Sequence, residues 1–302
     1  MAIVELEGIS KSYDKKVAVE QLSFRIEPST MFGLLGPNGS GKTSSIRMMI
    51  GITRPDAGTV KLFGKPFERQ SLERVGYLPE ERGLYKKMHV LDQLIFLGEL
   101  HGLSAATARK RALDWCERLE ITEAIPKKTE ELSKGMQQKI QFIATLLHEP
   151  ELIIMDEPFS GLDPINASLM QDTLMDLRRE GKAILFSTHR MDQVEKMCDA
   201  ICVISGGKQV LAGGMREIKQ RYPNNRVKIE FDGSDSFLKH ASVASAKNWG
   251  NHAEITLKDG DDAQALLAAA IKVAKIRRFE VSEPTLEQIF IEKVGAGGRI
   301  DA

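Results

Sequence analysis

The chain has 302 residues, of which 42% are hydrophobic, so it is long enough for one large domain and a smaller one. Its 42 basic and 42 acidic side chains cancel, which excludes a strong field that would attract nucleic acid or an anionic bilayer. The cysteines Cys116, Cys198 and Cys202 do not form a disulfide framework, and we expect buried thiols in a reducing compartment rather than a metal site.

The N-terminal part of the chain is rich in predicted strands. Three short segments separated by polar turns predict strands over residues 3–10, 17–28 and 31–36. Helical apolar spacing follows over residues 44–52, and turn residues with a short strand pair follow over 54–67. The segment 74–80 predicts a further strand, which ends at Pro79.

The middle of the chain changes to a helical pattern from about residue 84 to 149, where apolar residues recur at i, i+3 and i+4. We interpret this segment as a helical insert. Buried-strand runs at 151–158 and 183–189 then enclose a helix at 166–181, which is the order of a parallel sheet. Two more strands are predicted around the turn in residues 200–214.

The C-terminal part predicts a second domain. Residues 221–225 read as a linker, and residues 226–295 suggest a small α+β domain with a helix over 261–278. We expect a flexible tail at 296–302. The basic runs at 108–111 and 275–278 are predicted to be solvated helix faces.

Residues 36–44 carry the pattern G-x-x-x-x-G-K-[ST], directly after an apolar strand and before an apolar-periodic helix. Glycines let backbone N–H groups turn around phosphate oxygens, the lysine reaches the β and γ phosphates, and the threonine hydroxyl can bind Mg²⁺. The alternative is a simple turn before a helix. The pattern predicts nucleotide contacts from Gly36, Pro37, Asn38, Gly39, Ser40, Gly41, Lys42, Thr43 and Ser44.

Two carboxylates follow a second apolar run at the predicted carboxyl end of a strand. Asp156 and Glu157 there would be costly without a cationic partner, so we expect Asp156 to bind Mg²⁺ and Glu157 to act as the base for an attacking water. The run 183–189 ends in His189, which could contact the γ phosphate; otherwise it is a structural histidine. With Lys42, these residues are the expected catalytic set.

Five motifs in one order, "GPNGSGKT", "LSKGMQQK", "LIIMDEP", "SGLD" and "STH", resemble the nucleotide-binding subunit of an ABC transporter over residues 1 to about 220. The resemblance implies an α/β fold, a P-loop NTPase core with an N-terminal antiparallel β subdomain and the helical insert at about 84–149. The segment "SEPTLEQIFIEKVG" looks like the tail of exporter-type subunits, including those of sodium-efflux and drug-efflux systems. The C-terminal domain then either steadies a dimer or senses a ligand.

The resemblance also implies roles that one chain alone cannot fulfil. Two subunits would enclose two ATP molecules head to tail, with Ser133, Gly135 and Asp163 serving the nucleotide of the neighbour, and Tyr13 stacking on adenine. Independently of the resemblance, Ser133 is predicted to cap a helix whose apolar face is Met136, Ile140, Ile143 and Leu147. A tyrosine such as Tyr13 in a polar turn is otherwise a surface anchor.

Two departures from the family pattern concern charge. Glu80 stands where the family usually has a glutamine, and we expect it to bind Mg²⁺ together with Thr43 and Asp156. Lys134 and Met136 replace a glycine and a glutamine of the family signature. We expect the positive charge of Lys134 to offset part of the negative charge of Glu80.

These observations favour an ATPase that binds ATP and Mg²⁺, forms a homodimer or a heterodimer with a related subunit, and drives export through a separate integral membrane permease docked near residues 80–103. No apolar signal segment or membrane span is present in the sequence, so we expect the chain at the cytoplasmic face of the membrane and no nucleic-acid partner. The alternatives are a soluble ABC-type ATPase that acts on ribosomes or DNA, and a nucleotide-binding switch that does not hydrolyse.

Overall fold

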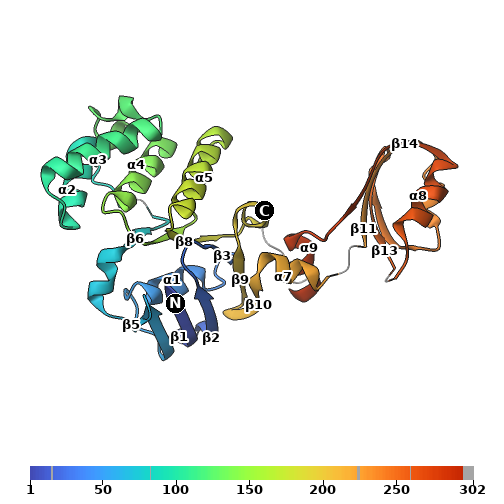
Figure 1. Ribbon diagram of the computed structural model, residues 1–302, viewed down its shortest axis with the longest axis horizontal. Coiled ribbons are helices and arrows are strands. Elements are labelled where there is room, and N and C mark those ends of the chain that lie inside the picture. The colour runs from blue at the N-terminus through green and yellow to red at the C-terminus, as the bar shows by residue number, and fades with distance from the viewer. Residues whose placement is uncertain (15, 82, 223–224, 259, 295–302) are drawn as a thin grey trace. The chain divides into compact units, whose positions relative to one another are not determined.

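The computed structural model describes residues 1–302 apart from 15, 82, 223–224, 259 and 295–302, so the predicted tail 296–302 lies outside the described residues. The chain divides into two compact units, of which the first runs from Met1 to Gly214 and the second begins at Met215 (Figure 1). Each unit is built on its own sheet. All of the site residues predicted from the sequence belong to the first unit.

The first unit mixes strands and helices, and its α/β fold class is confirmed. Its strands are β1 Val4–Tyr13, β2 Lys16–Ile26, β3 Met31–Leu35, β4 Ala57–Leu62, β5 Lys65–Pro66, β6 Val75–Leu78, β7 Leu152–Asp156, β8 Ala183–Thr188, β9 Ala200–Ser205 and β10 Lys208–Gly214. Its helices are α1 Lys42–Met49, α2 Val90–Leu100, α3 Ala105–Arg118, α4 Lys134–Leu146, α5 Pro164–Arg179 and α6 Met191–Met197. Its short 3₁₀ helices are η1 Arg69–Arg74, η2 Thr122–Ala124 and η3 Thr129–Glu131.

The strands of the first unit form one sheet in the order β5-β4-β1-β2-β10-β9-β3-β8-β7-β6. Neighbouring strands from β9 to β6 run parallel. The side chains of β3, β7 and β8 are buried along the whole strand, as the central strands of a parallel sheet require. At the other end, β1 pairs antiparallel with β2 and with β4, which forms the antiparallel part implied by the resemblance.

The carboxyl ends of four neighbouring parallel strands bring the predicted site residues to one edge of the sheet. β3 leads into the glycine loop, and β7 ends at Asp156. β8 ends directly before His189, and β6 ends shortly before Glu80. Since β3, β8, β7 and β6 are consecutive in the sheet, segments far apart in the sequence meet at this edge, where open α/β sheets bind ligands.

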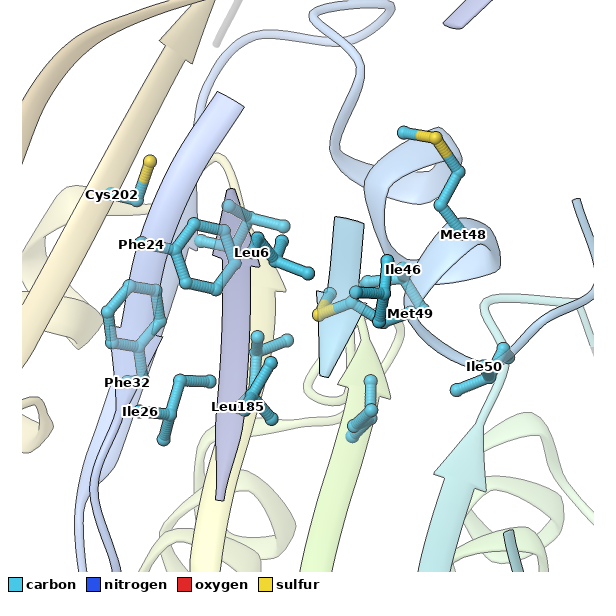
Figure 2. Close-up of a cluster of buried hydrophobic side chains, with 14 of the residues drawn as sticks. Leu6, Phe24, Ile26, Phe32, Ile46, Met48, Met49, Ile50, Leu185 and Cys202 are labelled. Carbon is cyan, nitrogen blue, oxygen red and sulfur yellow. The ribbon is translucent and has the colours of Figure 1, made fainter. Parts of the chain in front are cut away.

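A large apolar cluster anchors the strand and the helix on either side of the glycine loop. Ile46 and Met49 of α1 belong to one buried cluster with Leu185 of β8 and with residues of β1 and β2 (Figure 2). Phe24 and Phe32 stack in this cluster with ring centroids 4.7 Å apart. Burial of each such large side chain contributes roughly 1.5 to 3 kcal/mol, so the strand and the helix that flank the loop are firmly anchored.

The predicted helical insert contains α2, α3 and α4. Ser104 accepts a hydrogen bond from the backbone N–H of Thr107 at the start of α3, as serine N-caps do. In the basic run 108–111, Ala108 is buried and Arg111 donates a hydrogen bond of 2.7 Å to the carbonyl of Leu147. The run is therefore not only a solvated helix face, because it also ties α3 to the end of α4.

The second unit is an α+β domain. Its elements are α7 Met215–Gln220, β11 Arg226–Gly233, η4 Ser236–Lys239, β12 Val243–Asn248, β13 His252–Leu257, α8 Ala263–Ile271, β14 Ala274–Ser282 and α9 Leu286–Val294. The sheet has the order β12-β13-β11-β14 and is antiparallel throughout. Leu266 of α8 packs in one buried cluster with Val227, Ile229 and Phe231 of β11, which gives this unit its own core.

The second unit begins earlier in the chain than predicted. The sequence places the boundary near residue 220, whereas α7 already belongs to the second unit. Met215 and Ile218 of α7 are buried, and Lys219 lies 3.9 Å from the carboxylate of Glu283 in the same unit. The sequence could not predict this boundary, because the few apolar side chains of so short a helix do not indicate which of the two cores will bury them.

The helix predicted over 261–278 is wrong in its second half. α8 ends at Ile271, and residues 274–282 form β14, which pairs antiparallel with β11. Lys275, Arg277 and Arg278 of the basic run are therefore exposed on a strand rather than on a helix face, and Ile276 between them packs against the core. Pairing with β11 satisfies the backbone groups on one side of this edge strand, and local apolar spacing does not indicate such a long-range partner.

Candidate active site

The loop between β3 and α1 has a backbone that only glycine adopts easily. Gly39 has φ of 75° and Gly41 has φ of 111°. A Cβ atom on Gly41 would lie 2.3 Å from the carbonyl oxygen of Ala18, which is closer than atoms can approach. The loop thus needs glycine for both conformation and space, and it places Lys42 at the first position of α1.

Lys42 is 6% exposed, and its Nζ donates hydrogen bonds to the carbonyl oxygens of Gly36 at 2.8 Å and Pro37 at 3.3 Å. Burial lowers the pKa of Lys42, while the nearby carboxylates of Glu157, Asp156 and Glu80 oppose this shift. The ammonium group therefore folds back on its own loop and faces three acids. A phosphate chain in this place would offer it stronger, charged acceptors.

Asp156 is 1% exposed at the end of β7. Its Oδ1 accepts a hydrogen bond from the hydroxyl of Ser187 on β8, but its Oδ2 is buried without a hydrogen-bond partner among the described residues. A buried carboxylate oxygen without a partner costs free energy unless a cation binds it. Carboxylate and hydroxyl oxygens are the ligands that Mg²⁺ prefers, so Asp156 and the neighbouring Thr43 fit this ion.

Glu157 and His189 form a pair next to Asp156. Oε1 of Glu157 lies 3.0 Å from Nδ1 of His189 and 3.9 Å from Nζ of Lys42. Glu157 has φ of 48°, in the left-handed region that non-glycine residues rarely adopt. Its backbone N–H donates to the carbonyl oxygen of Ser187 at 3.1 Å, which helps hold this conformation. Such strain at a residue in a polar cleft is typical of a functional position.

A cavity of about 470 Å³ opens between these groups. Most of the predicted site residues line it, namely Tyr13, Asn38, Gly39, Gly41, Lys42, Thr43, Ser44, Glu80, Asp156 and Glu157. Gly36, Pro37 and Ser40 shape the loop, and His189 holds Glu157. The cavity is large enough for a nucleotide and combines a backbone cradle, a lysine and three acids.

Two further residues line the cavity that the sequence did not predict, Lys16 and Ala18. Lys16 is directly opposite Tyr13 in the β1–β2 hairpin, so a cation stands beside the proposed adenine platform. Lys16 could have been predicted only from the register of the hairpin, which pairs it with Tyr13. Strand periodicity alone does not fix that register when the turn is polar.

The other three predicted nucleotide contacts lie away from this cavity in the described part of the chain. Ser133 is exposed, and its side chain caps α4 by accepting from the backbone N–H of Met136 at 3.2 Å, as predicted. Gly135 lies in the first turn of the same helix. Asp163 caps α5 by accepting from the N–H groups of Ile165 and Asn166. Within one chain these three residues do not complete the cavity.

These features together define a P-loop ATPase core. They are a glycine loop with a lysine, a buried aspartate and a glutamate–histidine pair, all at the carboxyl edge of a parallel sheet. The family described as "ABC transporter" matches residues 19–160, and the family described as "ATP-binding protein DrrA1-3-like, C-terminal domain" matches residues 213–294. The chain belongs to the family of ABC transporter ATP-binding proteins, whose members are ATPases.

Two curated relatives and one solved structure illustrate this membership. The chain is 42% identical over 295 residues to the uncharacterized ABC transporter ATP-binding protein YhaQ of Bacillus subtilis (strain 168), across 97% of this chain and 99% of that protein. It is 38% identical over 215 residues to the Nod factor export ATP-binding protein I of Paraburkholderia xenovorans (strain LB400), across 70% of this chain and 71% of that protein. The solved structure of an ATP binding subunit of an ABC transporter covers 72% of this chain and 92% of its own, with a TM-score of 0.68 and 27% identity.

Proposed function

We propose that the chain hydrolyses Mg²⁺-bound ATP in a head-to-tail dimer and that this cycle drives export through a separate membrane permease. The observation that carries the proposal is that Lys42, Asp156 and Glu157 line one cavity. Oδ2 of Asp156 has no hydrogen-bond partner among the described residues, and His189 contacts Glu157. Each of these groups has a defined task in phosphoryl transfer to water.

Asp156, Thr43 and Glu80 would hold the Mg²⁺ ion, which supplies positive charge to the triphosphate when bound. Lys42 would exchange its bonds to the carbonyls of Gly36 and Pro37 for phosphate oxygens. Tyr13, which is partly exposed at the end of β1, offers its ring to adenine. These residues bind and orient ATP.

Glu157 is the general base of the proposed reaction. Its carboxylate would accept the proton of the attacking water, and His189 at 3.0 Å would hold that carboxylate in position and face the γ phosphate. Lys42 would stabilise the negative charge of the transferring phosphoryl group. The electron pair of the water oxygen forms the new bond to phosphorus as the bond to the β-phosphate oxygen breaks.

The proposed dimer is supported by three predicted nucleotide contacts that do not line the cavity within the described part of one chain. Ser133, Gly135 and Asp163 do not line it in the described residues, although Ser133 and Gly135 stand at the positive end of α4. Ser133 of the partner subunit would close the nucleotide site from the far side. A heterodimer with a related ATPase would meet the same need.

The permease is proposed to dock on an apolar patch made of Tyr85, Phe96 and Leu100. All three side chains are exposed, and the rings of Tyr85 and Phe96 meet edge to face with centroids 6.0 Å apart. Contiguous exposed apolar groups of this kind mark interaction surfaces. In the described part of the chain no helix has the length and apolarity to cross a bilayer. Docking on such a permease would hold the chain at the cytoplasmic face of the membrane, as we propose.

Export is proposed by analogy with the Nod factor export ATP-binding protein. The test is phosphate release by the purified chain under saturating Mg²⁺ and ATP, combined with light scattering. We expect hydrolysis and an ATP-dependent dimer. Nucleotide binding without phosphate release would instead support the non-hydrolysing switch, and release without any dimer would remove the head-to-tail site.

A further inference from the structure

Two buried glutamines lie on one face of α4. Gln138 is 4% exposed and Gln141 is 5% exposed, and residues three apart in a helix are neighbours on the same face. Buried polar side chains need hydrogen-bond partners, so their bonds show what the helix holds. Both Nε2 groups donate to backbone carbonyls, and in each case these carbonyls adjoin an acid of the candidate active site.

Gln138 holds the backbone next to the proposed general base. Its Nε2 donates to the carbonyl oxygen of Pro158 at 3.0 Å, in a buried place. Pro158 directly follows Glu157, whose φ of 48° is in the left-handed region. The backbone N–H of Glu157 donates to the carbonyl oxygen of Ser187, so β8 holds this segment on one side and α4 holds it on the other. A conformation that non-glycine residues rarely adopt persists only where the surroundings fix it.

Gln141 holds the short segment that carries Glu80. Its Nε2 donates to the carbonyl oxygens of Glu81 at 3.2 Å and of Pro79 at 3.4 Å, so the backbone is bonded on both sides of Glu80. Carbonyl oxygens only accept, so the amide presents its –NH₂ group to them. Glu80 lines the cavity and is a metal ligand in the proposed function. The same helix therefore supports the proposed base and a proposed metal ligand.

The start of α4 faces a different site in the proposed dimer. Ser133 caps this helix and would serve the nucleotide of the neighbour, and Gln138 lies five residues further along, at roughly 7 to 8 Å. The first turn of α4 also packs against the loop that follows Glu157, since a Cβ atom on Gly135 would lie 3.6 Å from Cδ2 of Leu162. A helix is a rigid element, so a displacement of its first turn also displaces the two glutamines.

We propose that Gln138 and Gln141 are positioning residues, through which α4 transmits contact with the neighbour's nucleotide to the two acids of its own chain's site. The inference rests on the head-to-tail dimer of the proposed function and names the residues that couple its two sites. Neither glutamine lines the cavity in the described part of the chain, so each acts through the backbone that it holds. A displacement of about 1 Å at a reacting group can reduce a rate by about 10²-fold.

The first test removes each donor at similar side-chain length, with Gln138→Met and Gln141→Met. Each should reduce the maximal rate of phosphate release about 10- to 100-fold and change the Kd of a fluorescent ATP analogue by less than about twofold, because the groups that contact the nucleotide remain. Gln93→Met is the matched control, since Gln93 is also buried in the helical insert and bonds to Tyr85 and Thr129, which adjoin neither acid. An unchanged rate in either folded α4 variant, or an equal loss in the control, would refute the positioning role.

Gln138→Glu makes the bond to Pro158 depend on pH. A protonated carboxyl group can donate to the Pro158 carbonyl, whereas a carboxylate can only accept and would repel it. The rate of this variant relative to the unaltered chain should therefore rise several-fold as the pH falls from about 8 to about 6, because burial favours the protonated form. A relative rate that is the same across this range would contradict the role of the Gln138 donor.

Gln141→Met has a second readout that does not depend on hydrolysis. Mn²⁺ is titrated in place of Mg²⁺ into the ATP-bound chain and followed by electron paramagnetic resonance. We expect several-fold weaker Mn²⁺ binding than in the unaltered chain, since the backbone on both sides of Glu80 loses its donor. Equal Mn²⁺ affinity would overturn the role of Gln141.

The link to the neighbour is tested by combining Ser133→Ala with Gln138→Met. If α4 transmits the contact, the second substitution removes part of what the first disturbs, and the double variant should be several-fold faster than the product of the two single effects. Effects that simply multiply would overturn transmission through α4 and leave ATP hydrolysis intact. No phosphate release from the unaltered chain would refute the proposed function together with this inference, so the two failures are distinguishable.

Discussion

Replacing Glu157 by glutamine tests the general base directly, because glutamine has the same shape and cannot accept a proton at neutral pH. Loss of a general base typically slows a reaction by 10² to 10⁴, which corresponds to about 3 to 5 kcal/mol of activation free energy. The carboxylate of Glu157 also lies 3.9 Å from Nζ of Lys42. At an effective dielectric constant of 20 that attraction is about 4 kcal/mol, and it competes with phosphate for the lysine.

Glu157→Gln should therefore reduce phosphate release strongly while ATP affinity stays level or rises. The substitution should also accumulate an ATP-bound dimer, because the step that opens the dimer is blocked. Phosphate release, binding of a fluorescent ATP analogue and light scattering measure the three quantities. Glu151→Gln is the matched control, since Glu151 precedes the same strand, is half exposed and pairs with Arg74. Unchanged hydrolysis in Glu157→Gln, or an equal loss in the control, would refute the role of Glu157.

Three further predictions concern other parts of the first unit. Tyr13→Ala should weaken ATP binding by about 1 to 3 kcal/mol, read as a higher Kd, and leave the maximal rate nearly unchanged, because the proposed role of this cavity-lining ring is to stack on the base and not to touch the phosphates. Glu80→Gln should retain measurable turnover, because a glutamine can still reach the metal and the positive charge of Lys134 no longer has to offset an acid; an inactive variant with intact ATP binding would contradict this compensation. The free energy of unfolding, followed in urea, should fall as the pH drops from about 6.5 toward 4, since burial holds the pKa of His148 below its ordinary value and the unfolded chain binds the proton first. His148→Phe should flatten this part of the pH dependence, and an identical slope in the variant would disprove the contribution of His148.

The first unit was largely predictable because its signals are local. The apolar runs that became β3, β7 and β8 are buried along their full length, and a parallel sheet requires such runs. The serine that starts α4 caps that helix, as its position before an apolar-periodic segment predicts. The second unit was less predictable. β12 is an exposed edge strand in which only Val243 is even partly buried, so its sequence carries no strand periodicity to recognise.

The sequence by itself determined the chemistry of this protein, since the glycine loop, its lysine and the acids after an apolar run are short motifs whose function follows from residue type and spacing. Only the tertiary structure decided which of these groups meet. Strand order and register bring Glu157 next to His189 and add Lys16 to the cavity. They also bury Oδ2 of Asp156, which has no hydrogen-bond partner among the described residues. Those features arise from long-range backbone pairing and shared burial. The residues of one segment do not specify which distant segment will pair with it, so local sequence patterns cannot predict them.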